Sequence, residues 1–195
     1  MSAPSAPRVM LIRHAEKPGE PPPPHGVDKH GDHDPESLSV HGWQRAGALA
    51  CFFAPTHGPL QSPLLTTPAV LYAAAPEDSK GSSDGSKSER PLETITPLAK
   101  KLGLTIDTNF TKGQEAQVAE AAMAEGGVVL VCWQHQDAHL IANAILGDDT
   151  TAPQKWPGDR YDIVWVFDLQ PGGSYSFTQV PQMLLAGDVP DPIAA

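Results

Sequence analysis

The sequence is poor in cysteine, in basic residues and in long apolar runs, and each shortage excludes a class of protein. Its only cysteines, Cys51 and Cys132, have no metal-type spacing, and we expect both to be reduced residues of the core. Thirteen Lys and Arg against 23 Asp and Glu give a net charge of -10, which argues against nucleic acid and anionic membranes as partners. No apolar run approaches the roughly 18 residues of a membrane span. The start of the chain lacks the pattern of a secretory signal, so we expect a cytoplasmic protein.

The length of 195 residues suits one domain, which we expect to span residues 1–195. The composition, 40% hydrophobic and 18% charged, is typical of a globular chain. Two stretches depart from it: residues 19–37 are rich in proline and histidine, and residues 76–88 are rich in serine and glycine. Both are predicted to be surface loops inserted into the domain, and residues 1–7 a flexible N-terminus.

Short apolar runs without alternation predict strands that are buried on both faces, as in a parallel sheet. Near the end of the chain, two strand-like runs joined through "QPGG" predict an antiparallel hairpin. The expected strands are residues 8–12, 69–74 and 128–133, followed by the hairpin of residues 161–169 and 174–180.

Helical spacing of apolar residues, with capping and terminating residues, predicts four helices. The first begins at Ser37 or Ser39 and runs to about Phe53; the others are residues 91–102, 113–127 and 137–147. Pro97 interrupts the second pattern and is expected to kink that helix. The order of elements predicts an α/β fold of three layers, with a mostly parallel central sheet and helices on both faces.

Arg13 and His14 directly follow the first expected strand, and His135 follows a later strand closely. Ligands in such folds bind outside the carboxyl ends of the strands, so the two histidines are expected to meet at one edge of the sheet. Arg90, at the start of a helix, is a third candidate. A neutral imidazole is a good nucleophile, and guanidinium groups suit the oxygens of a phosphoryl group in transfer. The set points to phosphoryl transfer, although each residue alone is also typical of an ordinary loop or helix start.

Four segments, taken in order, resemble the signature of the histidine phosphatase superfamily, the phosphoglycerate mutase-like phosphatases. The first is an apolar strand followed by Arg-His-Ala, and the last is a late strand that leads to a second histidine. The segments are "LIRHAEKP", "LSVHGWQRA", "LYAAAP" with "SERPLETITPLAKKLGL", and "VVLVCWQH".

The resemblance implies a phosphoglycerate mutase-like fold and a role for each matching residue. His14 would be the nucleophile that becomes phosphorylated, while Arg13, Arg90 and His135 would bind the phosphoryl group and stabilise its charge. Lys17 is near enough in sequence to contact the substrate, although a solvent-exposed lysine is equally typical of this position. No cofactor and no metal are implied.

The chain departs from the family pattern at two points. Many members have Gly-His at the second histidine, whereas Trp133 and Gln134 precede His135 here. The tryptophan either narrows the site or belongs to the core. The glutamate acid of the mutase branch has no recognisable context, and without a strong acid, good leaving groups are favoured. The carboxylates considered as the acid are Glu115, Glu93, Asp137 and Glu16.

The histidine-rich part of loop 19–37 allows a rival interpretation as a metal site. Its spacing matches no known site, and we expect the loop to overhang the pocket as a lid. The candidate ligands are His25, Asp28, His30, Asp32, His33 and Asp34.

We therefore expect a metal-independent histidine phosphatase that acts on a phosphate monoester, an anhydride or a phosphoprotein. A phosphoglycerate mutase-type transferase is an alternative, as is a catalytically weak phosphate-binding regulatory module on the same fold. The expected partner is a small phosphorylated substrate or a phosphoprotein. We also expect His14 to react as the neutral form and His135 to act as a cation beside a bound phosphate dianion, with activity falling as His135 loses its proton.

Overall fold

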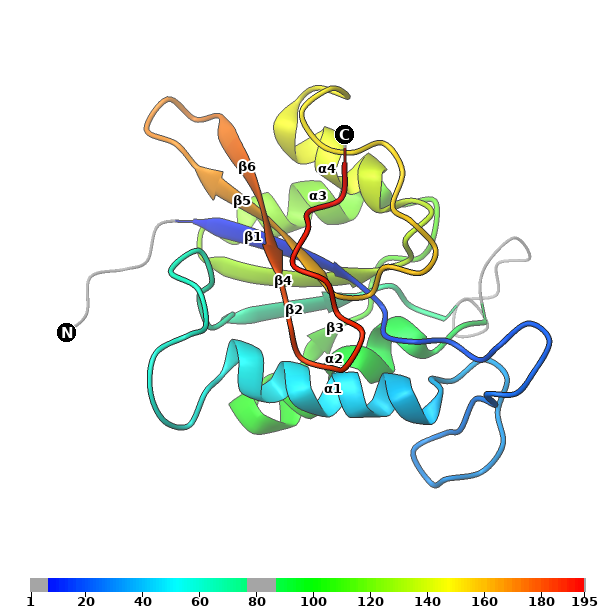
Figure 1. The fold of residues 1–195 in the computed structure, drawn as a ribbon. Helices are drawn as coiled ribbons and strands as arrows, with labels where there is room; N and C mark the ends of the chain where they lie inside the picture. Colours follow the sequence, from blue (N-terminus) through cyan, green and yellow to red (C-terminus); the bar gives the residue numbers. More distant parts are fainter. Residues whose placement is uncertain (1–6, 77–86, 195) are drawn as a thin grey trace.

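The computed structural model describes residues 7–76 and 87–194 and is built around a six-stranded sheet in the order β3-β2-β4-β1-β5-β6 (Figure 1). The first four strands run parallel, and β5 and β6 form the predicted antiparallel hairpin. The mostly parallel sheet is thereby confirmed. The strands are β1 (Arg8–Arg13), β2 (Val70–Ala73), β3 (Ile106–Asp107), β4 (Val128–Trp133), β5 (Ile163–Leu169) and β6 (Tyr175–Pro181).

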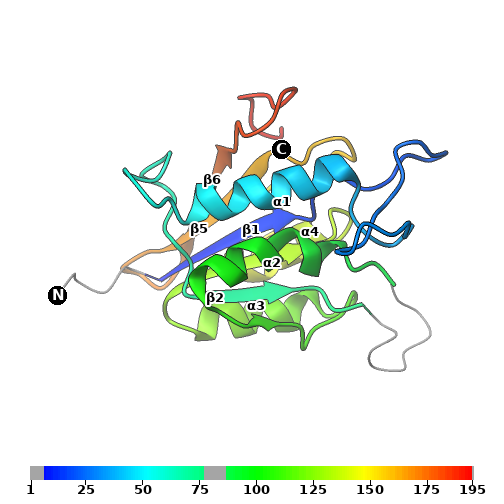
Figure 2. The same ribbon diagram turned by 90° about the horizontal axis from the view of Figure 1, so that it is seen from below.

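Helices cover both faces of the sheet, which confirms the three layers (Figures 1 and 2). Successive side chains of β1 point to opposite faces: Val9 and Leu11 join one core cluster, Met10 and Ile12 the other. Both clusters are buried, which explains why the strand lacks alternation. On one face lie α1 (Val40–Phe53) and α2 (Arg90–Leu102), and on the other α3 (Glu115–Ala124) and α4 (Ala138–Leu146).

Local sequence signals set the ends of these helices. The Ser39 hydroxyl accepts a hydrogen bond from the Gly42 amide and caps α1. At the carboxyl ends of α2 and α4, Gly103 and Gly147 adopt φ angles of 67° and 76°, a left-handed conformation that suits glycine. The α2 helix continues through Pro97.

Some details of the fold differ from the sequence-based expectations, and parts of two expected segments are not described by the structure. The two-residue strand β3 was not expected, and α3 is shorter than the predicted range 113–127. Cys51 is exposed, so its assignment to the core is wrong, because it lies on the outer side of α1; Cys132 is buried. Residues 1–6 and 77–86 of the two predicted flexible or loop segments lie outside the described residues.

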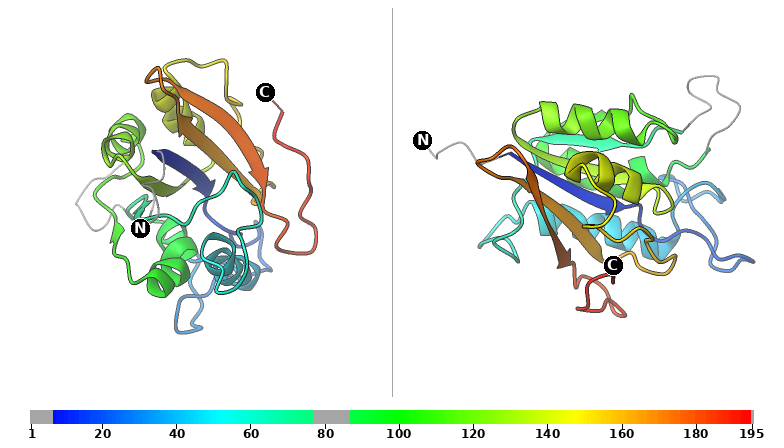
Figure 3. Two further views of the ribbon diagram at one scale, coloured as in Figure 1. Left: turned by 90° about the vertical axis from the view of Figure 1, so that its left-hand side faces the viewer. Right: turned by 90° about the horizontal axis from the view of Figure 1, so that it is seen from above.

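The parallel register brings the carboxyl ends of β1 and β4 to one edge of the sheet. Arg13 pairs with Trp133, and the His14 amide donates to the Trp133 carbonyl oxygen at 3.0 Å. The helix α2 begins at Arg90 near this same edge. On the other side of β1, the β5–β6 hairpin extends the sheet, and the last segment of the chain runs beside it (Figure 3). Within the described residues, no helix combines the length and apolar character of a membrane span.

Candidate active site

A cavity of about 210 Å³ opens at the carboxyl edge of the parallel strands. His14, Arg90, His135 and Lys17, all predicted from the sequence, contribute to its wall, whereas Arg13 lies behind it. The lining consists of His14, Lys17, Glu20, Ser88, Arg90, Lys112, Gln134, His135 and Gln136.

His14 is held in one tautomer. Its Nδ1 lies 2.7 Å from the carbonyl oxygen of Ala15, which can only accept, so Nδ1 carries the proton and Nε2 carries the lone pair. The side chain is only 4% exposed. Burial and the charge of Arg13 lower the pKa of His14 well below 6.5, so the imidazole is neutral at pH 7. In this tautomer the lone pair of Nε2 is the one available for nucleophilic attack.

Arg13 is buried beneath the cavity and orients His135. Its Nη2 lies 3.2 Å from Nδ1 of His135, and because a guanidinium can only donate, Nδ1 accepts and the proton resides on Nε2. Burial and the charge of Arg13 lower the pKa of His135 to about 4. In the unliganded site His135 is therefore a neutral N–H donor, whereas its expected cationic form refers to the site with a phosphate dianion bound and stays a prediction.

A carbonyl-lined turn holds the Arg13 guanidinium. Its Nη1 donates to the backbone oxygens of Pro157, Gly158 and Arg160 at 3.0–3.1 Å, and the group stacks 3.8 Å from the ring centre of Tyr161. Burial lowers the pKa of Arg13 to about 10, so it remains charged at neutral pH. The positive charge is thus fixed in place next to both histidines.

Thr94 connects the segment that follows His14 to the helix that begins with Arg90. The Ala15 amide donates to the Thr94 hydroxyl at 2.8 Å, and that hydroxyl donates to the Arg90 carbonyl at 2.7 Å. Thr94 is fully buried. The Arg90 guanidinium donates in turn to the Pro35 carbonyl at 2.9 Å, so loop 19–37 also helps to place it.

None of the four carboxylates considered as the general acid is among the residues that line the cavity. Glu115 accepts from the buried indole of Trp133, which assigns that tryptophan to the core. Glu93 accepts from the Ser37 hydroxyl and the Leu38 amide, although burial raises its pKa. Asp137 is ion-paired with Lys112 at 3.5 Å.

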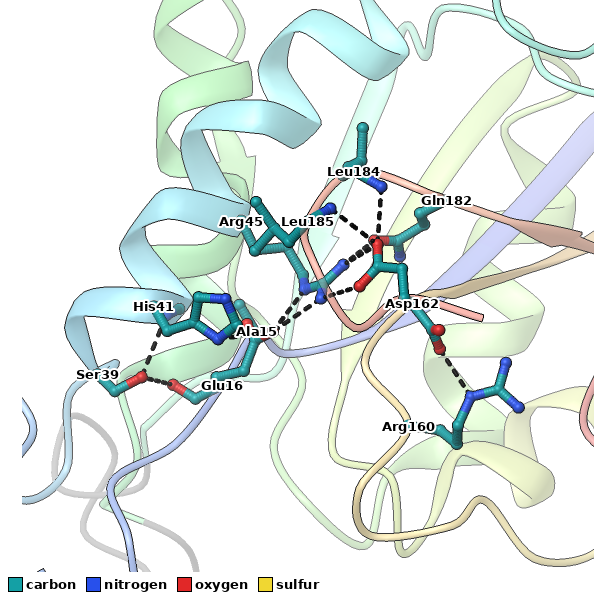
Figure 4. A network of polar contacts seen from close by, with 12 residues as sticks. Ala15, Glu16, Ser39, His41, Arg45, Arg160, Asp162, Gln182, Leu184 and Leu185 are labelled. Carbon is teal, nitrogen blue, oxygen red and sulfur yellow. Dashed lines mark hydrogen bonds and ion pairs between the residues drawn. The ribbon is translucent and has the colours of Figure 1, made fainter. Parts of the chain in front are cut away.

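Glu16, the fourth candidate, belongs to a buried ionic network that anchors the segment after His14 (Figure 4). Arg45 of α1 donates to Glu16 from Nε at 2.9 Å and from Nη2 at 2.8 Å. The same guanidinium binds both carboxylate oxygens of Asp188 and the Gln182 side chain. Although burial opposes it, the hydrogen bonds to Asp188 and Glu16 raise the pKa of Arg45. The network therefore connects the segment that follows His14 to α1 and to the C-terminal segment.

The histidine-rich loop covers the pocket only where it begins. Glu20 reaches the cavity wall, where its carboxylate binds Lys17 at 2.9 Å. Farther along, Asp28, His30 and Asp34 line a different cavity of about 750 Å³ beside α2. In the part of the chain that the structure describes, no group of three or more His, Cys, Asp or Glu is arranged to hold a metal ion.

Several residues of the site were not singled out from the sequence. Tyr161 faces Arg13, and its ring centre is 6.3 Å from that of His14. It precedes a strand by two residues, and no spacing connects it to the Arg-His pair. Lys112 and Gln136 also reach the cavity wall. Gln134 was noted only as a departure from Gly-His, and its burial is a tertiary property.

Comparison of the sequence with protein-family models and with curated proteins finds no match. Solved structures do match, over nearly the whole chain. Phosphoserine phosphatase from Entamoeba histolytica, in complex with 3-phosphoglyceric acid, gives a TM-score of 0.55 at 14% identity, with 91% of this chain and 99% of that chain covered. The protein histidine phosphatase SixA, complexed with tungstate, gives 0.53 at 13% identity, covering 90% and 97%. A mycobacterial glucosyl-3-phosphoglycerate phosphatase gives 0.50 at 13% identity, covering 91% and 98%.

The chain therefore has a phosphoglycerate mutase-like fold, which it shares with these solved phosphatases. At 13–14% identity the likeness establishes the fold, and activity has to be argued from the residues of the site.

Proposed function

We propose that this protein is a metal-independent phosphatase that hydrolyses a small phosphorylated substrate or a phosphoprotein through a phosphohistidine on His14. The observation that carries the proposal is the bond from Nδ1 of His14 to the Ala15 carbonyl, at the wall of a cavity shared with Arg90 and His135. This bond leaves the Nε2 lone pair free for attack on phosphorus. Burial and the neighbouring charge of Arg13 favour the neutral imidazole, which is the form that attacks, and groups with a perturbed pKa cluster at functional sites.

In the first step, Nε2 of His14 attacks phosphorus and the bond to the leaving group breaks, with its electron pair departing on that group. His14 becomes an imidazolium that carries the phosphoryl group on Nε2 and keeps the proton on Nδ1. The Ala15 carbonyl accepts from that proton and so stabilises the new positive charge. Arg90 and the Nε2–H of His135 supply donors to the phosphoryl oxygens, and a fixed donor of this kind contributes roughly 3 kcal/mol.

In the second step, water attacks phosphorus and the P–N bond breaks. Its electron pair returns to Nε2 of His14, which regenerates the neutral imidazole with its proton still on Nδ1. The two protons of the water remain with the product, dihydrogen phosphate. No proton has to reach the departing imidazole, so this step needs no general acid.

The cavity wall favours substrates with good leaving groups. Glu20 is the carboxylate among the lining residues, and its hydrogen bond to Lys17 lowers its pKa, which makes it a weak proton donor at neutral pH. Alkyl phosphates need a proton on the leaving oxygen, whereas phosphoanhydrides, acyl phosphates and phosphohistidine do not. We therefore place the substrate among the latter group.

The direct test is turnover of para-nitrophenyl phosphate in the presence of EDTA. We expect activity that is unchanged by the chelator and lost in His14→Ala. His57→Ala is the matched control, because His57 is an exposed histidine in the segment after the carboxyl end of α1. Full activity in folded His14→Ala, or loss on chelation that zinc or magnesium restores, would contradict the proposal.

A further inference from the structure

Gln134 lines the cavity, and the oxygen of its buried amide has no hydrogen-bond partner among the described residues. Its side chain is 6% exposed, and its Oε1 is buried with no hydrogen-bond partner in the part of the chain that the structure describes. Buried side-chain oxygens almost always accept a hydrogen bond, so an orphan of this kind calls for an explanation. Gln134 lines the same cavity as His14.

The chemistry of the cavity restricts what Oε1 can bind. An amide oxygen only accepts, and the oxygens of a phosphoryl dianion also only accept, so the two do not pair. The partner must therefore bring an O–H or an N–H. In the proposed two-step reaction, the species that brings an O–H to phosphorus is the hydrolytic water.

Position supports this assignment. Arg13 and Trp133 are paired across the parallel strands β1 and β4, so the residues that follow them, His14 and Gln134, leave the sheet side by side. The cavity of about 210 Å³ has room for a phosphoryl group and for water, which occupies about 30 Å³ per molecule in the liquid.

We propose that Gln134 is a further catalytic residue, whose Oε1 accepts a hydrogen bond from the water that attacks the phosphohistidine. The inference rests on the proposed function and concerns its second step alone. The amide takes no proton: it orients the water oxygen toward phosphorus while the P–N bond breaks and dihydrogen phosphate forms. Orientation of water by a neutral glutamine is an established device in phosphoryl transfer.

The experiment compares Gln134→Leu with the wild type in rapid mixing with para-nitrophenyl phosphate, and separately with phosphoramidate. Phosphohistidine is preserved by an alkaline quench and counted per active site. We expect Gln134→Leu to form the phosphoenzyme at the wild-type rate and to hydrolyse it about 10- to 100-fold more slowly. The variant then shows a burst that approaches one nitrophenolate per site. The control is Gln117→Leu, because Gln117 is exposed on α3 and lies outside the cavity lining.

Thermal unfolding separates this role from a structural one. Leucine removes the unpartnered polar group, so Gln134→Leu should melt at or above the wild-type temperature. Hydrolysis of the phosphoenzyme at the wild-type rate, or slowing of both steps by one factor together with a lower melting temperature, would overturn the inference alone. A wild type that forms no phosphohistidine with either donor would overturn the proposed function, and this inference with it.

Discussion

Arg13 and His135, 122 positions apart in the sequence, meet behind the candidate active site, where Nη2 of the arginine donates to Nδ1 of the histidine at 3.2 Å. The contact fixes the tautomer of His135, because the nitrogen that receives a guanidinium N–H cannot itself be protonated. The remaining nitrogen, Nε2, carries the hydrogen that is available to a ligand. The arginine thus acts on the site through the histidine and through its charge.

A variant that keeps the positive charge of Arg13 but lacks its guanidinium tests whether Arg13 orients His135. In Arg13→Lys, the ammonium cannot donate to three backbone oxygens and to His135 at once, so His135 loses its fixed orientation. We expect kcat/KM for para-nitrophenyl phosphate to fall by about 100-fold. Arg8→Lys, at the opposite end of β1, is the control and should retain activity. Equal activity of the two variants would show that the Arg13 guanidinium does not orient His135.

Thr94 connects the segment that follows His14 to α2, so loss of its hydroxyl should lower both stability and catalytic activity. Thr94→Val keeps the shape but leaves the buried Ala15 amide without an acceptor, which should cost about 1–3 kcal/mol of unfolding free energy. Thr94→Ser retains the hydroxyl and should be much closer to the wild type. Denaturant unfolding and kcat/KM measure the two effects. Equal stability of the valine and serine variants would contradict the role.

Gly42 allows α1 to approach the segment after His14. A Cβ added at Gly42 would collide with the carbonyl oxygen of Glu16, which is backbone and cannot rotate away. We expect Gly42→Ala to lower the melting temperature and kcat/KM together. Gly47→Ala on the same helix has open space around the added Cβ, and it should gain about 0.5–1 kcal/mol of stability. The prediction fails if both alanine variants are stabilised.

The lowered pKa of His14 predicts activity in acid. The free-enzyme imidazole stays neutral through pH 6.5, the ordinary histidine value, and accepts a proton only well below it. Because attack requires the neutral form, kcat/KM should keep its neutral-pH value through pH 6.5 and fall only at more acidic pH. Since His135 is already neutral, with a pKa of about 4, its titration should not produce a decline between about pH 7 and about pH 8.5. An acid limb centred near 6.5 for para-nitrophenyl phosphate would contradict this prediction.

Much of the fold was predictable because local signals and burial agree. The uninterrupted apolar run of β4 sets its limits, and the Ser39 cap and Gly147 terminus mark their helices. The strand β3 was missed because a strand of two residues is too short to show a hydrophobic pattern. Cys51 was misassigned because an apolar neighbourhood in sequence does not reveal which side of a helix faces out.

The site was predictable only in part, for a physical reason. His14 and His135 follow strand ends, so topology alone brings them to one edge. The tautomer of His135 depends on which nitrogen Arg13 contacts, and the carboxylate of Glu115 is held by the indole of Trp133. Those contacts connect residues that are distant in sequence. No local pattern encodes them, and for the same reason the burial of Gln134 was not foreseen.

The most direct test of the account is the location of the phosphoryl group during turnover. Wild-type protein mixed with para-nitrophenyl phosphate or phosphoramidate, quenched in alkali and digested, should yield a peptide phosphorylated at His14. The phosphorus NMR spectrum of the alkali-denatured phosphoprotein should assign the bond to Nε2, the nitrogen that the Ala15 carbonyl leaves free. Phosphorylation of His135, attachment at Nδ1 of His14, or turnover with no phosphoenzyme in the wild type or in the slow-hydrolysing Gln134→Leu variant would contradict the account.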